Sequence, residues 1–165
     1  ISDKNKVHIT GITTGKIVDF GVKDSMNMGA CMAPAAGNVI VQNFIDNGRK
    51  PEWYDKIITG DLGLVGKDIL LDITRSKGYD IADRYMDCGI EIYSREQEIQ
   101  AGGSGCGCSA SMLAGYIVKM LEKGTWQRVL FVPTGALLSP VSFNEGDSVP
   151  GIAHAVVFEC SGESQ

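Results

Sequence analysis

The sequence predicts one three-layer α/β domain, in which helices cover both faces of a central sheet. Three observations favour this fold class. Strand-like apolar runs alternate along the chain with segments of helical periodicity, and the connections between them are short. The run Arg128–Thr134 is continuously apolar at its centre, as expected for a strand buried in the middle of a sheet. A length of 165 residues suits a single domain of ordinary size.

The first half of the chain contains two strands and two helices in alternation. Val7–Asp19 is rich in β-branched residues, and its two glycines, Gly11 and Gly15, indicate a bent or bulged strand. Pro34 fits the first turn of a helix that runs to about Asn47, with Gly48 as its left-handed end.

The next elements follow the same alternation. Asp55–Thr59 is a short apolar strand that Gly60 interrupts. Val65–Lys77 has the periodicity of a second helix, with Gly78 as its stop.

The second half begins with a predicted strand and ends with two more. We expect a strand at Gly89–Tyr93, a polar turn at Ser94–Glu98, and a segment at Ile99–Ala101 that pairs back. An amphipathic helix over Ser111–Lys123, with Gly124 after its end, precedes the central strand. Ile152–Glu159 then closes the domain as the last strand.

Charge and cysteine usage exclude several classes of protein. A net charge of −5 without a basic stripe argues against a nucleic-acid partner. Five cysteines without a C-x-x-C pair, together with two distant histidines, support neither a disulfide framework nor a metal site. The sequence has no apolar run of membrane-spanning length and no recognisable signal peptide. Since the first residue is not Met, we expect the start of the gene product to lie elsewhere.

The glycine-dense stretch Ala101–Ala110 is the most informative candidate site. It leads directly into a predicted helix, whose first N–H groups and positive dipole end suit an anion. Because glycine has no side chain, Gly102, Gly103 and Gly105 can present N–H groups beside the Ser104 hydroxyl. The same small residues would equally allow close packing of the helix against a neighbour. Both interpretations remain open from the sequence.

Other chemistry at this loop has less support. The spacing matches neither a P-loop nor a dinucleotide-binding fingerprint. Cys106 or Cys108 could act as a thiolate nucleophile only with a base and an oxyanion hole. The two imidazoles, His8 and His154, fall in predicted strands among apolar neighbours, which favours ordinary strand histidines.

Two aspartates, Asp61 and Asp87, are further candidates for a functional site. Asp61 lies just after Thr59, in the loop at the end of a short strand, where open α/β sheets place ligands. Asp87 begins a second acidic loop. Each could orient a ligand or cap a helix.

The motifs taken together resemble the stage V sporulation protein AD family, a thiolase-fold family of spore-forming bacteria. The matching segments span nearly the whole chain and read Met28-Gly-Ala-Cys-Met-Ala-Pro-Ala-Ala36, Thr59-Gly-Asp-Leu62, Asp87-Cys-Gly89, Ala101-Gly-Gly-Ser-Gly-Cys106, Thr134-Gly-Ala-Leu-Leu-Ser-Pro140 and Ile152-Ala-His-Ala155.

The resemblance covers only the second of two similarly folded halves. It implies that residues 1–165 form a single thiolase-like half domain, α/β/α, with a mixed five-stranded sheet and helices on both faces. Residues 1–6 would be the tail of the hairpin between the halves. We therefore expect a C-terminal fragment that needs the N-terminal half as a partner, and that self-associates through its third helix without it.

The resemblance also implies a protein without catalytic activity. The thiolase superfamily takes its nucleophilic cysteine from the first half, and its second half adds His/His or His/Asn groups in two loops. Here those loops are 59–63 and 102–108, and they contain neither residue type. Without such donors the transition state loses several kcal/mol of stabilisation per group. The alternative is the second half of an acyl-CoA thiolase or ketoacyl-synthase type of enzyme.

What the resemblance implies instead is binding of dipicolinic acid and help with its uptake into the developing spore. The protein would sit peripherally at the cytoplasmic side of the forespore membrane, against membrane subunits of a transport complex. We expect no metal of its own, but calcium can accompany dipicolinate. A third hypothesis for the function is a pure interaction module that docks to membrane subunits and has a closed cleft. The expected ligand-binding residues are Thr59, Asp61, Gly102, Gly103, Ser104, Gly105 and Cys106.

Overall fold

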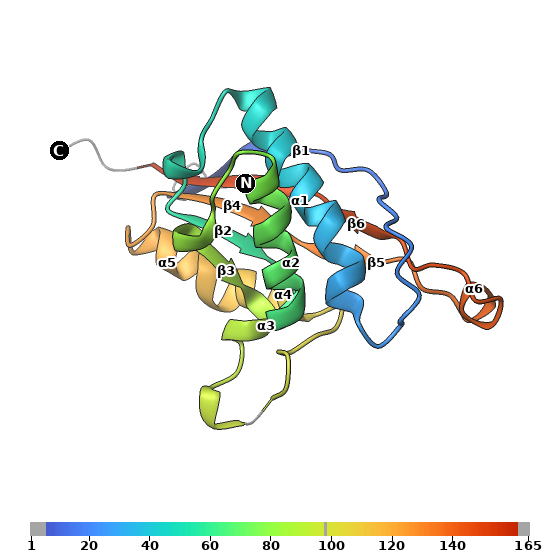
Figure 1. Ribbon diagram of the computed structural model, residues 1–165. Coiled ribbons are helices and arrows are strands. Elements are labelled where there is room, and N and C mark those ends of the chain that lie inside the picture. The colour runs from blue at the N-terminus through green and yellow to red at the C-terminus, as the bar shows by residue number, and fades with distance from the viewer. Residues whose placement is uncertain (1–5, 98, 162–165) are drawn as a thin grey trace.

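A mixed five-stranded sheet forms the centre of the chain in the computed structural model, which describes residues 6–97 and 99–161 (Figure 1). The strand order is β1-β7-β4-β2-β3. β7 is antiparallel to both of its neighbours, whereas β4, β2 and β3 run parallel to one another. The carboxyl ends of these three parallel strands therefore meet at one edge. The strands are β1 (Val7–Thr13), β2 (Lys56–Thr59), β3 (Tyr85–Asp87), β4 (Arg128–Val132) and β7 (Ala155–Cys160).

One face of this sheet is covered by α1 (Met28–Asn47) and α2 (Gly63–Ser76) (Figure 1). The larger hydrophobic core lies between these helices and the sheet. α1 begins before the predicted first turn, because the Asn27 side chain accepts a hydrogen bond from the N–H of Ala30 and caps the helix there. Pro34 lies inside the helix and not at its start, which corrects the sequence-based boundary.

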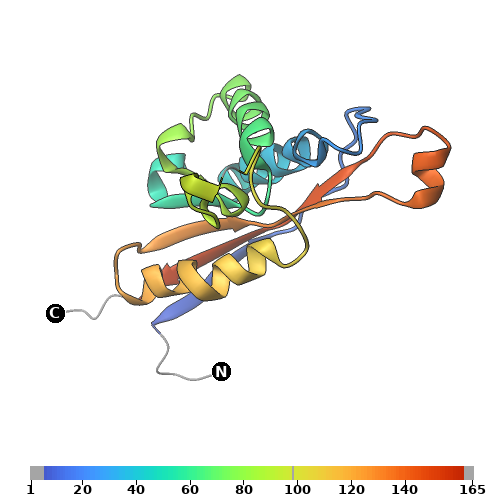
Figure 2. The ribbon, with the colours of Figure 1, turned by 90° about the horizontal axis from the view of Figure 1, so that it is seen from below.

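The opposite face carries the third helix, which is continuous over three segments (Figure 2). α4 (Cys108–Met112) and α5 (Val118–Glu122) flank a π-helical turn, η4 (Leu113–Ile117). A second buried cluster fills the space between this helix and the sheet. Helices on both faces confirm the predicted three-layer arrangement.

Left-handed glycines end all three long helices, as the sequence predicts. Gly48, Gly78 and Gly124 have φ values of 60°, 86° and 73°. Only glycine adopts this conformation without a steric penalty.

The predicted strand at Gly89–Tyr93 is wrong. Those residues belong largely to a short helix, α3 (Cys88–Glu91), and the strand lies just before it as β3. Asp87 is the reason, because its side chain accepts a hydrogen bond from the N–H of Ile90 and starts the helix.

The predicted strand at Ile99–Ala101 is also absent, since the Ala101 carbonyl accepts a hydrogen bond from the N–H of Leu64. The predicted turn at 94–98 contains η3 (Arg95–Gln97), and residue 98 lies outside the described residues.

The first strand is bulged but shorter than predicted. Its pairing with β7 shifts register between Ile9 and Gly11, which confirms the bulge. The strand ends at Thr13, and Gly15 approaches the backbone of Ala153 too closely for any side chain. Residues 1–5 of the expected inter-half hairpin lie outside the described residues.

The predicted last strand is divided between two sheets. Gly151–Ala153 forms β6, which pairs with β5 (Thr134–Ala136), and the chain then enters the main sheet as β7. Between β5 and β6, α6 (Pro140–Asn144) stands at the tip of a hairpin that projects from the body (Figures 1 and 2). The sequence did not predict this hairpin. Two more 3-10 turns, η1 (Pro51–Trp53) and η2 (Ala82–Arg84), complete the fold.

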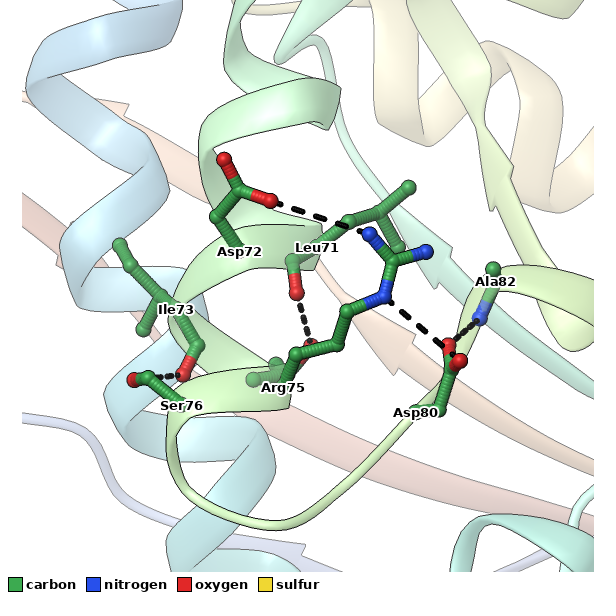
Figure 3. A network of polar contacts seen from close by, with 8 residues as sticks. Leu71, Asp72, Ile73, Arg75, Ser76, Asp80 and Ala82 are labelled. Carbon is green, nitrogen blue, oxygen red and sulfur yellow. Dashed lines mark hydrogen bonds and ion pairs between the residues drawn. The ribbon is translucent and has the colours of Figure 1, made fainter.

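Polar contacts hold the carboxyl end of α2, at the opposite end of the helix from the carboxyl ends of the parallel strands. The Arg75 guanidinium lies 3.7 Å from the Asp72 carboxylate and 3.6 Å from the Asp80 carboxylate. The Asp80 carboxylate also accepts a hydrogen bond from the N–H of Ala82 (Figure 3). Exposed ion pairs of this kind contribute little to stability.

None of the described helices combines the length and apolar character needed to cross a membrane.

Candidate functional site

Asp87 joins three elements at the carboxyl edge of the sheet. Its side chain is 1% exposed and its two oxygens accept four hydrogen bonds. The donors are the Thr59 hydroxyl at 2.6 Å and the N–H groups of Leu62 at 2.9 Å, Gly63 at 3.1 Å and Ile90 at 3.2 Å. Asp87 therefore ties the end of β2 and the start of α2 to the start of α3. Of the two roles expected for Asp87, the structure shows capping.

Thr59 lies below the surface of the site. Its side chain is 0% exposed, and the Tyr85 hydroxyl lies 2.6 Å from the same oxygen that donates to Asp87. Burial raises the pKa of Tyr85, so that hydroxyl remains neutral. The Thr59 hydroxyl makes both of its hydrogen bonds inside the protein, and its role is to position Asp87.

Asp61 connects the two loops that the sequence singled out. One carboxylate oxygen accepts a hydrogen bond from the N–H of Gly105 at 3.1 Å, and the other accepts one from the Thr134 hydroxyl at 3.2 Å. Burial raises the pKa of Asp61, and the nearby charge of Asp87 adds to the rise, while its two hydrogen bonds oppose it.

The glycine loop packs closely against α3 and Tyr93 at Gly102 and Gly103, and it has open space beside it at Gly105. Gly103 donates its N–H to the Gly89 carbonyl at 2.6 Å, and the Tyr93 ring lies so close to Gly103 that a Cβ there would clash. Gly102 has a φ of 127° and also packs against Gly89. Gly105, with a φ of 119°, has open space where a side chain would stand. Packing therefore accounts for the first two glycines.

A hollow of about 300 Å³ lies beside the open end of the loop. Ser104, Gly105 and Cys106 line it together with Tyr93 and Ser111. Four of the predicted site residues, Gly103, Ser104, Gly105 and Cys106, thus share one concave surface, and Asp61 touches it through its bond to Gly105. Thr59 does not reach it.

The buried thiols near the site are poor nucleophiles. Burial, aided by the charge of Asp87, raises the pKa of Cys88 to about 12. Burial also raises the pKa of Cys108, whose thiol donates to the Gly60 carbonyl at 3.7 Å. Both thiols therefore stay protonated at neutral pH. Cys106 is exposed.

Both histidines make their hydrogen bonds elsewhere. His8, in the edge strand β1, contacts the Ser161 hydroxyl at 2.8 Å. His154 lies between β6 and β7, where its Nδ1 accepts the N–H of Gly15 at 3.1 Å. In the part of the chain that the structure describes, the hydrogen bonds around Asp61 and Asp87 include no imidazole and no asparagine amide.

Several residues of this site, including Thr134, Tyr93, Tyr85 and Ser111, were missed at the level of sequence. Thr134 follows the central strand, and its place at the carboxyl end of that strand is a signal that could have found it. Tyr93 stands in a predicted strand, so no local pattern indicated that its ring would line the hollow.

The family comparison agrees with the resemblance seen in the motifs. The family model described as stage V sporulation protein AD matches residues 1–159. Stage V sporulation protein AD of Bacillus subtilis (strain 168) is 46% identical over 156 residues, which cover 94% of this chain and 46% of that protein. The chain therefore spans about half the length of this relative.

Solved structures resemble the fold at low identity. A variant of OleA from Xanthomonas campestris superimposes with a TM-score of 0.53 at 13% identity, covering 94% of this chain and 56% of that one. A 3-oxoacyl-(acyl carrier protein) synthase III from Xanthomonas oryzae pv. oryzae gives a TM-score of 0.50 at 12% identity, with the same coverage of both chains. These likenesses show a thiolase-like α/β fold. With a matching family model over nearly its whole length and a relative at 46% identity, this chain belongs to the stage V sporulation protein AD family.

Proposed function

We propose that this chain is the second half of a non-catalytic thiolase-fold protein of sporulation that binds dipicolinic acid and assists its uptake into the developing spore. The observation that carries the proposal is an open hollow of about 300 Å³ beside Gly105 and Asp61, at the edge where the parallel strands end. A hollow of this size suits a small ligand.

The groups around the hollow favour binding over condensation chemistry. Acyl condensation needs donors aimed at an oxygen that becomes negative. The group that lies there instead is Asp61, whose ionised carboxylate accepts hydrogen bonds and would repel such an oxygen.

A flat aromatic dicarboxylate matches the lining in shape and in donors. The Tyr93 ring offers an aromatic wall, and the Ser104 and Ser111 hydroxyls can donate to carboxylate oxygens. The Gly105 N–H becomes a further donor when the Asp61 carboxylate releases it. Because the pKa of Asp61 is raised, its neutral form is more accessible than that of an ordinary aspartate.

Calcium would arrive with the ligand as cargo. An ionised Asp61 repels a dianion, and a divalent cation between them turns that repulsion into attraction. Carboxylate oxygens are suitable calcium ligands, so the proposal includes dipicolinate together with calcium.

The proposed partners include the N-terminal half and membrane subunits on the cytoplasmic side of the forespore membrane. Ile9 and Ile12 are 59% and 67% exposed, and Ile9 pairs with Phe158 on the face that carries α5. Ala114 and Gly115 leave the outer side of the third helix exposed and small. Such an apolar face needs a cover. We propose the other half as that cover, and self-association through the third helix when it is absent.

Calorimetric titration of dipicolinate into the full-length protein, with and without calcium, tests the binding function. Ser104→Phe fills the hollow from an exposed position and should abolish binding. Ser76→Phe, at the exposed end of α2, is the matched control and should bind normally. Unchanged affinity in Ser104→Phe would place the ligand elsewhere.

An acyl-transfer assay tests the alternative. Turnover of a coenzyme A thioester by the full-length protein, lost when residues of this half are changed, would favour an enzyme of the thiolase or ketoacyl-synthase type. The open hollow supports ligand binding over a pure docking module with a closed cleft.

A further inference from the structure

A second hollow, of about 400 Å³, lies between the first turns of α2 and the loop that follows α3. We call it the Lys67 hollow, and its walls include Leu64, Lys67, Ile90, Glu91, Tyr93 and Ile99. Tyr93 also lines the first hollow, so the two hollows adjoin at this residue. Of the predicted ligand-binding residues, Gly102 lines this second hollow, whereas Ser104, Gly105 and Cys106 do not.

The described walls combine apolar surface with the cationic side chain of Lys67. Leu64, Ile90 and Ile99 are aliphatic, and Tyr93 adds an aromatic ring. Lys67 is half-buried, and its ammonium makes no hydrogen bond or ion pair with any side chain or backbone group that the structure describes. A half-buried lysine whose ammonium has no partner among the described residues can form a charge-assisted hydrogen bond with an anion that enters the hollow.

Backbone hydrogen bonds hold the walls in place. The N–H of Leu64 donates to the Ala101 carbonyl at 2.8 Å, and the N–H of Gly103 donates to the Gly89 carbonyl at 2.6 Å. These two bonds fasten the returning end of the loop to α2 and α3. Gly63 has a φ of 63°, and a Cβ there would lie 2.5 Å from the Ala101 oxygen, so only glycine permits this approach. The hollow is therefore largely formed before any ligand binds.

We propose that the Lys67 hollow binds a monocarboxylate whose carboxyl group is attached to a flat apolar or aromatic body. The carboxylate pairs with the Lys67 ammonium, and the body packs between Tyr93 and the aliphatic walls. Glu91 contributes a negative charge to the same lining, so a second carboxylate on the ligand would be repelled. This charge pattern distinguishes the Lys67 hollow from the site proposed for dipicolinate, and the proposal does not depend on that function.

Titration of benzoate into the full-length protein, followed by calorimetry, tests this site. Lys67→Gln should weaken benzoate binding roughly tenfold or more, because a charge-assisted hydrogen bond is lost. Lys67→Arg keeps the charge and should retain most of the affinity. Glu91→Gln removes the repelling charge and should tighten binding. Benzamide, which has the same ring without the charge, should bind much more weakly than benzoate.

Several results would overturn the proposal. They are no benzoate binding to the unmodified protein, equal binding by Lys67→Gln, and loss of benzoate binding in Ser104→Phe with Lys67→Gln unaffected. Thermal unfolding of each variant shows that it is folded. Dipicolinate titrated into Lys67→Gln reports separately on the first hollow, so failure of one site is distinguishable from failure of the other.

Discussion

Asp61 and Gly105 stand 44 residues apart in the sequence, yet the Gly105 N–H donates to the Asp61 carboxylate at 3.1 Å. This one bond joins the loop after β2 to the loop before the third helix. It also places a carboxylate whose pKa is raised next to the backbone donor that an anionic ligand would use. The proposed binding of an anion at Gly105 would therefore be coupled to the charge of Asp61.

Asp61→Asn should make dipicolinate binding independent of calcium. Asparagine keeps an oxygen that can accept from Gly105 but removes the negative charge that repels a dianion. We expect tighter binding without calcium and little further gain when calcium is added, measured by calorimetry of the full-length protein. A calcium dependence equal to that of the unmodified protein would show that Asp61 does not face the ligand.

The same residue should leave a signature in the pH dependence of stability. Because the folded-state pKa of Asp61 lies above its ordinary value of 3.8, the folded protein holds this proton more tightly than the unfolded chain. The contribution of Asp61 to the free energy of unfolding is therefore greatest at low pH and falls as pH rises through the folded-state pKa. The stability of Asp61→Asn relative to the unmodified protein should rise as the pH increases from below 3.8 through the folded-state pKa, measured by urea unfolding. A constant difference across that range would contradict the raised pKa.

Asp87→Ala should strongly destabilise the protein. The substitution leaves the buried donors of Leu62, Gly63, Ile90 and Thr59 without their acceptor. We expect a loss of about 3 kcal/mol or more in the free energy of unfolding, measured in urea. Asp46→Ala, on the exposed side of α1, is the control and should change little. An equal effect of the two substitutions would show that Asp87 is not the hub described above.

Gly89→Ala should destabilise the protein, whereas Gly115→Ala should stabilise it. A Cβ at Gly89 would overlap the Gly103 carbonyl, while a Cβ at Gly115 meets nothing within 4 Å on an exposed part of the third helix. We expect losses of about 1–3 kcal/mol for the first and gains of up to about 1 kcal/mol for the second. Thermal unfolding compares them directly, and similar melting temperatures would argue against the close packing of α3 on the glycine loop.

Thiol reactivity should separate Cys106 from its buried neighbours. Cys106 is exposed, while Cys88, with a pKa of about 12, and Cys108 are buried and protonated. A disulfide reagent at pH 8 should label Cys106 rapidly and the other two only slowly. Cys106→Ser should remove the fast phase, and a fast phase that persists would have to come from another thiol.

Local sequence patterns determine much of the architecture of this chain. The apolar run Arg128–Thr134 identified the central strand, and Gly48, Gly78 and Gly124 marked the ends of the three long helices. These features depend on periodicity and on glycine's freedom at positive φ, which act over a few residues. The bulge near Gly11 and the closeness of Asp61 to the glycine loop were also anticipated.

The misassigned segments depend on contacts that no short window contains. Gly89–Tyr93 looks like a strand by composition, yet Asp87 caps a helix there and the glycine loop packs against Gly89. The run from Ile152 to Glu159 looks continuous, but its first residues pair with β5 and its later ones with β1 and β4.

Contacts between residues far apart in the sequence also decide which residues make up the candidate site. Parallel strands bring loops from residues 59–63, 87–92 and 101–108 to one edge. Only there does Thr134 reach Asp61, and only there do Tyr93 and Lys67 line hollows. Residue spacing along the chain governs local conformation, whereas long-range packing governs which side chains face the same cavity.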